Sequence, residues 1–294
     1  MKSIKKTAST KTKSYYGDVL DKLFRHKLAI GGIITLALIL LAVLLLPPLL
    51  KLDPYTTSRG IAYTKPSAEF PLGLDSLGRD NLARLLYGGR TSLIVGLLSS
   101  CVSLVIGVPL GLCAGYFRNG VEAIVMRLVD IFMSFPSMIL IMVLVSVIGP
   151  SLGSVVLVIG IMGWPQYARI VYGNVLSVSS KDYVEGAVAV GQSRFRIIRD
   201  YILPNSFSPV LVTTTYNTAS SILQEASLSY LGMGVLPPEA SLGNILNNAQ
   251  SLTTLATRAW FWLPPGILLA LIVLSINFIG DGVRDALDPK MKYR

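Results

Sequence analysis

Three long apolar runs constrain the fold of this chain more than any other feature of its sequence. Residues 28–50 form 23 consecutive positions without a charge, residues 91–117 form 27, and residues 259–280 form 22. A helix needs about 20 predominantly apolar residues to cross the hydrocarbon core of a bilayer. Each run is therefore long enough to span a membrane as a single helix.

The overall composition agrees with this interpretation. Of the residues, 52% are hydrophobic and 14% are charged, whereas about a quarter of the residues of a typical soluble domain are charged. The sequence predicts an all-α polytopic membrane protein. We expect six transmembrane helices, near residues 28–50, 91–117, 124–148, 153–172, 206–231 and 260–280.

The distribution of positive charge explains the net charge of +10. With the six expected spans, 18 of the 26 Lys and Arg residues fall in segments on one side of the membrane and 6 fall on the other. The richer side is cytoplasmic by the positive-inside rule, so both termini are expected in the cytoplasm. Because topology accounts for the basic excess, no nucleic-acid partner is predicted, and the basic N-terminal tail is expected to contact anionic lipid.

The expected spans divide the chain into five parts. We expect a cytoplasmic basic tail and interfacial helix, a first transmembrane helix, an external segment, a five-helix core that includes a cytoplasmic loop at 173–205, and a cytoplasmic tail. Their respective boundaries are 1–27, 28–50, 51–90, 91–280 and 281–294. Within the external segment, Asp80 and Arg84 are spaced for a surface ion pair on a helix. No grouping of His and Cys residues predicts a metal site.

A charged, amphipathic stretch at residues 181–204 separates the fourth and fifth expected spans. It is predicted to form two short helices broken at Gly191, a residue that readily takes a left-handed backbone conformation. Ser193 is a candidate cap for the second helix. Helices this short cannot cross a bilayer, so the stretch must lie in water and contact another surface.

Two further patterns concern the expected spans. Gly107, Gly111 and Gly115 recur every four residues on one face of the second span, which predicts close packing against another helix. The fifth span is unusually polar, and its side chains Asn217, Ser221, Gln224 and Glu225 follow one helical face. A carboxylate at depth costs about 2.5–3.5 kcal/mol on insertion scales, so this face should avoid lipid. It is either a wall of a substrate path or a set of interhelical hydrogen bonds.

These motifs resemble, in order, those of the membrane subunits of binding-protein-dependent ABC importers. Residues 181–204 resemble the "EAA" loop of such subunits, through Glu185-Gly186-Ala187, Gly191 and Leu203-Pro204. Residues 70–90 resemble the "LGTDxxGRDxxxRxxxG" motif of the dipeptide/oligopeptide/nickel permeases, with Leu74 and Ala83 departing from it. Further matches lie at 126–136, 163–169, 225–234 and 280–289, so the resemblance covers about three quarters of the chain and is to the C-type permease subunit.

The resemblance implies a type I ABC importer permease fold in a prokaryotic inner or plasma membrane. It further implies that the chain forms half of a peptide translocation path. The expected partners are a homologous second permease subunit, one or two ATPase subunits and an extracytoplasmic substrate-binding protein. The sequence contains no G-x-x-x-x-G-K-[ST] phosphate loop. We therefore expect no enzymatic activity and no bound cofactor in this chain, with ATP and Mg used by the partner subunits.

The resemblance also implies roles for residues. The loop helices would dock in a cleft on the ATPase, with contacts from Tyr183, Val190, Gly191 and Phe195, and Glu185 would anchor the loop by capping or pairing. The alternative is a loop that packs only beneath its own bundle. Glu225 falls in the family pattern "EAxLSFLGxG", which favours a structural role for it.

Alternative functions follow from the same residues. Within the same machinery, nickel or a metal chelate is the nearest rival to peptides as cargo. A self-sufficient secondary transporter or channel is the alternative from a different class. It would require ionisable residues in several spans or an inverted repeat, and the sequence has one deep carboxylate, Glu225.

Overall fold

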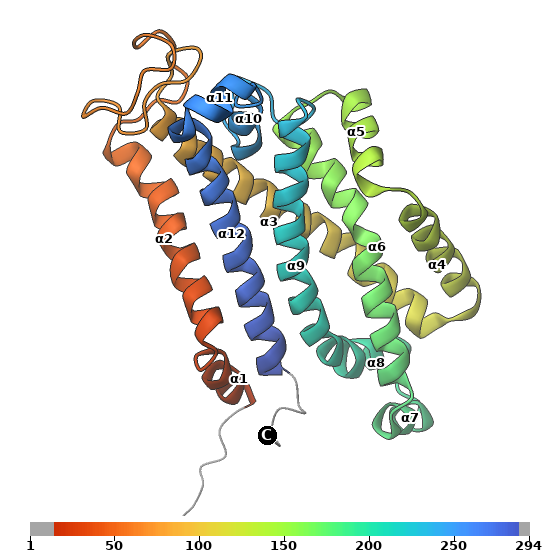
Figure 1. Cartoon of the computed structure of the whole chain (residues 1–294). Coiled ribbons are helices and arrows are strands. Elements are labelled where there is room, and N and C mark those ends of the chain that lie inside the picture. The colour runs from red at the N-terminus through yellow and green to blue at the C-terminus, as the bar shows by residue number, and fades with distance from the viewer. Residues whose placement is uncertain (1–14, 288–294) are drawn as a thin grey trace, which may run out of the picture.

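The computed structural model describes residues 15–287, and helices make up most of this part of the chain (Figure 1). Within these residues the only β-type pairing is an isolated bridge between Leu74 and Asp80. The predicted basic tail and the end of the C-terminal tail lie outside the described residues. The protein is therefore all-helical in its described part, as expected.

Four long helices run through the molecule; three lie roughly alongside one another, and the fourth, drawn in gold, crosses behind them obliquely (Figure 1). By length and hydropathy, each is able to span a bilayer: α2 (Lys27–Leu49), α3 (Asn81–Phe117), α6 (Leu152–Ser179) and α12 (Ala259–Leu287). A fifth long helix, α9 (Leu203–Tyr230), has 28 residues but is not apolar enough to count as a candidate span. Its polar face, already evident in the sequence, is the reason.

The expected third span is not a single helix. It consists of α4 (Asn119–Ser134) and α5 (Ser137–Ile148), which are bent by 90° relative to each other. Phe135, which precedes Pro136, takes an extended backbone conformation with ψ of 146°, because a proline ring disfavours helical geometry in the residue before it. By length and hydropathy the described residues therefore hold four candidate spans, or five if the bent pair counts as one, so the six expected spans are not confirmed.

The glycines of α3 allow close contact with α6, as predicted. A Cβ added to Gly107 would lie 2.5 Å from the carbonyl oxygen of Trp164, and one added to Gly111 would lie 2.6 Å from that of Ala168. No larger side chain fits at either position without moving the α6 backbone. The small-residue face of α3 is thus its packing surface against α6.

The two ends of the bundle carry different short elements (Figure 1). The helices α1 (Tyr15–Leu23), α7 (Asp182–Ala189) and α8 (Arg194–Ile197) lie at one end; a π-helical turn, η1 (Ile198–Ile202), leads from α8 into α9. The segment between α2 and α3 lies at the other end with α10 (Leu242–Asn247) and α11 (Leu252–Thr257). The 181–204 stretch and the segment 51–80 therefore lie at opposite ends of the helix bundle.

The boundary predicted at residue 90 lies inside α3. This helix begins at Asn81, where the carboxylate of Asp80 accepts a hydrogen bond of 2.9 Å from the Leu82 backbone N–H as an N-cap. Asp80 is therefore a cap, and the expected surface ion pair with Arg84 is wrong. The last ten residues of the predicted external segment form the first turns of α3.

Arg84 instead joins a buried charge cluster. Asp75 accepts a hydrogen bond of 2.7 Å from Arg79 Nε, and Arg84 Nε lies 3.6 Å from the same carboxylate oxygen. A second nitrogen of Arg84 donates to Asn244 in α10 at 3.3 Å. All of these side chains are buried, so the cluster fastens the 51–80 segment to α3 and to α10.

Candidate functional site

The 181–204 stretch is anchored to the bundle by one face. Val184 and Ala187 of α7 are buried in a cluster with Val178, Ile197 and Ile202. Gly191 has φ of +75°, and its N–H and that of the next residue bond back to the last turn of α7, which is a left-handed helix ending of the predicted kind. Its predicted role as a helix breaker is confirmed. The side chain of Ser193 makes no capping hydrogen bond, so that prediction is wrong.

The other face of the stretch is exposed and apolar. Val190 is 76% exposed, Phe195 is 73% exposed and Tyr183 is 47% exposed. Large apolar side chains gathered on a polar-flanked loop mark an interaction surface more often than a free one. We call Tyr183, Val190 and Phe195 the loop patch.

The remaining predicted loop residues surround this patch. Glu185 and Gly186 are exposed, and within residues 15–287 the Glu185 carboxylate has no hydrogen-bond or ion-pair partner. Leu203 and Pro204 form the exposed start of α9. The expected capping or pairing of Glu185 is therefore not found within the described chain, and its carboxylate is available to another molecule.

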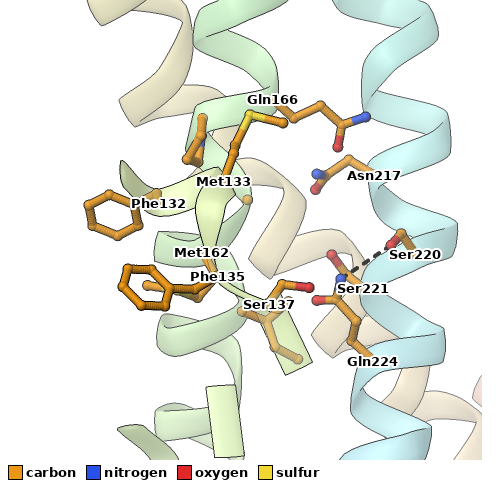
Figure 2. A pocket seen from close by; sticks show the side chains of 13 residues that line it. Phe132, Met133, Phe135, Ser137, Met162, Gln166, Asn217, Ser220, Ser221 and Gln224 are labelled. Carbon is orange, nitrogen blue, oxygen red and sulfur yellow. Dashed lines mark hydrogen bonds between the residues drawn. The ribbon is translucent and has the colours of Figure 1, made fainter. Parts of the chain in front are cut away.

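A cavity of about 250 Å³ lies where α6, α9 and the α4–α5 bend meet. Figure 2 shows Asn217, Ser221 and Gln224 of α9 facing Gln166 of α6 and Ser137 at the bend. None of the described residues that line this cavity is ionisable. Its walls offer amides, hydroxyls, thioethers and aromatic rings; the lining set comprises Phe132, Met133, Phe135, Ser137, Ile159, Met162, Gly163, Pro165, Gln166, Asn217, Ser220, Ser221 and Gln224.

The amides in the cavity retain unused hydrogen-bonding capacity. Asn217 is buried, and its Oδ1 atom has no hydrogen-bond partner among the described residues. Gln224 Nε2 donates to Ser220 Oγ at 3.3 Å, the one bond drawn in Figure 2. A buried amide oxygen without a partner is uncommon in folded proteins, so this atom is suited to accept a hydrogen bond from a molecule in the cavity.

Glu225 is separate from this cavity. Its carboxylate is fully buried and accepts hydrogen bonds from Ser92 of α3 at 2.7 Å and from Ser229 at 2.8 Å. The Ser229 hydroxyl also accepts a bond from the Val235 backbone N–H. These contacts hold α9 to α3 and to the loop that follows α9, which favours a structural role for Glu225.

Several lining residues were missed by sequence analysis. Gln166, Ser220 and Met133 come from three different helices and Phe135 from the break between α4 and α5, and only the fold brings them together. The one available signal was Gln166, a polar residue beside Pro165 inside an expected span. The side chains from α4 and α5 could not be placed without knowing that their helices meet at a right angle.

Comparison with known proteins identifies the family. Residues 107–293, more than half of the chain, match the family described as binding-protein-dependent transport system inner membrane component. The chain belongs to this family. Residues 14–66 match a second family, the N-terminal TM domain of oligopeptide transport permease C. The resemblance drawn from the sequence motifs is therefore confirmed.

Two curated relatives align over nearly the whole permease. The di/tripeptide transport system permease protein DppC of Pseudomonas aeruginosa is 39% identical over 277 residues, covering 92% of this chain and 90% of the relative. The dipeptide transport system permease protein DppC of Alkalihalophilus pseudofirmus is 36% identical over 279 residues, covering 95% and 91%.

A solved structure shows the same fold. The MetNI methionine ABC transporter in an inward-facing conformation aligns with a TM-score of 0.59 and 23% identity, covering 70% of this chain and 97% of that one. The fold is thus that of an ABC transporter permease. Family membership makes this protein a multi-pass membrane subunit of an ABC importer whose ATPase activity lies in partner subunits. It decides against a self-sufficient secondary transporter or channel.

Proposed function

We propose that this permease forms half of the translocation path of an ATP-driven peptide importer. The observation that carries the proposal is the uncharged cavity lined by Gln166, Asn217, Ser221 and Gln224. Amide and hydroxyl groups can donate to peptide C=O groups and accept from peptide N–H groups. Such a wall can bond to the peptide backbone without selecting particular side chains. The relatives named for dipeptide and tripeptide transport agree with this cargo.

The proposed topology has six crossings, with both termini in the cytoplasm of a prokaryotic cell. The bent α4–α5 pair supplies the third crossing and α9 supplies the fifth. A helix as polar as α9 is compatible with a membrane because its polar face lines the cavity and contacts α3. The asymmetry of Lys and Arg supports this orientation.

The proposed coupling surface is the loop patch. Tyr183, Val190 and Phe195 would insert into a cleft on an ATPase subunit, and Gly191 would permit close approach of the backbone. The free carboxylate of Glu185 is a candidate for a contact with that subunit, while Gly186, Ala187, Leu203 and Pro204 shape the loop. The further proposed partners are a homologous permease subunit, a second ATPase, which either matches the first or differs from it, and an extracytoplasmic substrate-binding protein.

Nickel or a metal chelate is the rival cargo within the same machinery, and the cavity offers a metal two thioethers, those of Met133 and Met162. Thioether sulfur is a soft ligand and selects metals such as Cu(I). Among the described residues, however, no group of three or more His, Cys, Asp or Glu side chains is arranged to hold a metal ion. The cavity therefore favours peptides.

Uptake assays distinguish the two cargoes. A strain that lacks this permease is complemented with the wild-type chain or with Asn217→Leu, and the uptake of a labelled dipeptide, a labelled tripeptide and radioactive nickel is measured. We expect the wild-type chain to restore peptide uptake alone and the variant to restore less of it. Restored nickel uptake without peptide uptake would contradict the proposed cargo.

A further inference from the structure

A second cavity, of about 290 Å³, lies at the end of the bundle that carries the loop patch. It is bounded by the end of α3 with Arg118, by the end of α6 with Ser179, by α7, and by Arg194 at the start of α8. It has no lining residue in common with the cavity beside α9. The role proposed above for that cavity therefore does not account for this one.

The second cavity has the chemistry of an anion site. Arg118 and Arg194, from distant parts of the chain, both line it; both are exposed, and neither has an ion-pair partner within residues 15–287. The Ser179 hydroxyl is buried and has no hydrogen-bond partner among the described residues. Two guanidinium groups and an unused hydroxyl match the oxygens of a phosphate group.

Among the described residues, no carboxylate lines this cavity. Glu122, which follows Arg118 by one helical turn, accepts a hydrogen bond from the Tyr172 hydroxyl on α6. It is committed to a different contact and does not line the cavity. The positive charge is therefore available to a ligand.

The position of the cavity indicates which phosphate compound would enter it. The candidate span α3 ends at Phe117, and both Tyr116 and Phe117 line the cavity directly before Arg118. Aromatic residues followed by a basic residue are typical of the level of lipid headgroups on the cytoplasmic side. Val184 and Val188 of α7 add an apolar wall suited to the glycerol part of a lipid.

We propose that this cavity binds the phosphate of an anionic phospholipid. Basic pockets between transmembrane helices on the cytoplasmic side are suited to such headgroups. The bound lipid touches α3, α6, α7 and α8 together, so it steadies the loop patch relative to the bundle. Binding itself does not depend on the proposed role of that patch or on peptides as cargo.

The test measures lipid retained by the assembled transporter. Wild-type complex, Arg118→Gln/Arg194→Gln and Ser179→Ala are purified in neutral detergent, and bound phosphatidylglycerol is quantified by native mass spectrometry, with phosphatidylcholine as the reference lipid. Arg127→Gln/Arg196→Gln is the matched control, since it removes the same charge from exposed residues of α4 and α8 that lie outside the cavity. Inorganic phosphate is added in a separate arm.

We expect the wild type and the control to retain phosphatidylglycerol and the Arg118/Arg194 variant to lose roughly tenfold in retention, because two basic contacts are removed. Ser179→Ala should lose less, and inorganic phosphate should not displace the lipid. Equal retention in all forms would overturn the proposal. So would displacement by inorganic phosphate, which assigns the site to a free anion, or loss of the ATPase subunits from the variant with lipid retention unchanged, which assigns the arginines to the ATPase interface.

Discussion

Gly191 combines a left-handed backbone with open surroundings. Its φ is +75°, and an added Cβ would meet no atom of the chain within 4 Å. The left-handed conformation costs an ordinary residue about 1–2 kcal/mol, which the fold can absorb, whereas a partner pressed against this backbone cannot accept a new side chain. Sensitivity at this position therefore reports on docking more than on folding.

Gly191→Asp is expected to lower peptide uptake by roughly tenfold or more, the change that corresponds to about 1.4 kcal/mol. The measurement is uptake in a deletion strain, together with the amount of inserted chain and the ATPase activity of the isolated partner. Gly186→Ala is the control, since Gly186 is exposed within α7 and its substitution favours the helix. Normal uptake with Gly191→Asp would remove the reason for placing coupling at this residue.

The α9 residues Asn217 and Ser221 test the cavity. In a background with Cys101→Ser and Cys113→Ser, Asn217→Cys and Ser221→Cys should react with a water-soluble thiol reagent in the assembled transporter, because both positions line the cavity. Ile222→Cys is the matched control because Ile222 is fully buried in the core shared by α3, α9 and α12. Protection of all three cysteines would favour the interpretation that this face only holds helices together.

The sequence predicted some residues of the site and not others for a definable reason. Gly191 and the face of Asn217, Ser221 and Gln224 depend on local backbone geometry and helical periodicity, which can be read from neighbouring positions. The orientation of Glu225 toward Ser92 depends on where α3 passes. The sequence of α9 alone therefore cannot show that part of its polar face lines the cavity while Glu225 bonds to a neighbouring helix.

At the level of helices, the glycine face of α3 makes a sharp prediction. Gly111→Leu should prevent α3 and α6 from packing, because even a Cβ would lie 2.6 Å from a backbone oxygen of α6. Overpacking of this kind typically costs about 1–3 kcal/mol or more. We expect less folded chain in the membrane and a lower unfolding temperature in detergent. Gly173→Leu in α6 is the control, with no atom near its added Cβ, and an equal loss there would contradict the assignment.

A second prediction concerns the buried charge cluster that fastens the 51–80 segment to α3 and α10. Asp75→Asn removes the carboxylate that faces Arg79 and Arg84, and breaking a buried pair this way typically costs about 3–5 kcal/mol. The unfolding temperature should fall clearly in Asp75→Asn. It should change little in Asp53→Asn, which removes an exposed carboxylate beside Arg59. Equal shifts would mean that the cluster adds no stability.

The helices themselves were largely predictable, because apolar runs of about 20 residues allow few alternatives to a span. The third expected span is the exception. Pro136 predicts a kink in the third expected span, but whether a proline bends or fully breaks a span depends on the packing around it. Here Phe132 of α4 packs edge-on against Trp164 of α6, and Asp130 pairs with Arg169, contacts that no local pattern reveals.

For the whole molecule, the arrangement of the two ends connects fold to function. The loop patch and the cavity with Arg118 and Arg194 lie at one end of the bundle, and the charge cluster around Asp75 lies at the other. The uncharged cavity lies among the helices between them. The proposed coupling surface and the proposed translocation path therefore lie in different parts of one bundle.

Site-specific photocrosslinking tests the central claim, that the loop patch is where an ATPase subunit docks. A photoreactive phenylalanine analogue is placed at Phe195, or at Leu252 in α11 as the control, since both side chains are highly exposed and lie at opposite ends of the bundle. After irradiation of the intact transporter, we expect an adduct between position 195 and an ATPase subunit and none from position 252. An adduct with that subunit from position 252, or its absence from position 195, would show that the ATPase does not dock at the loop patch.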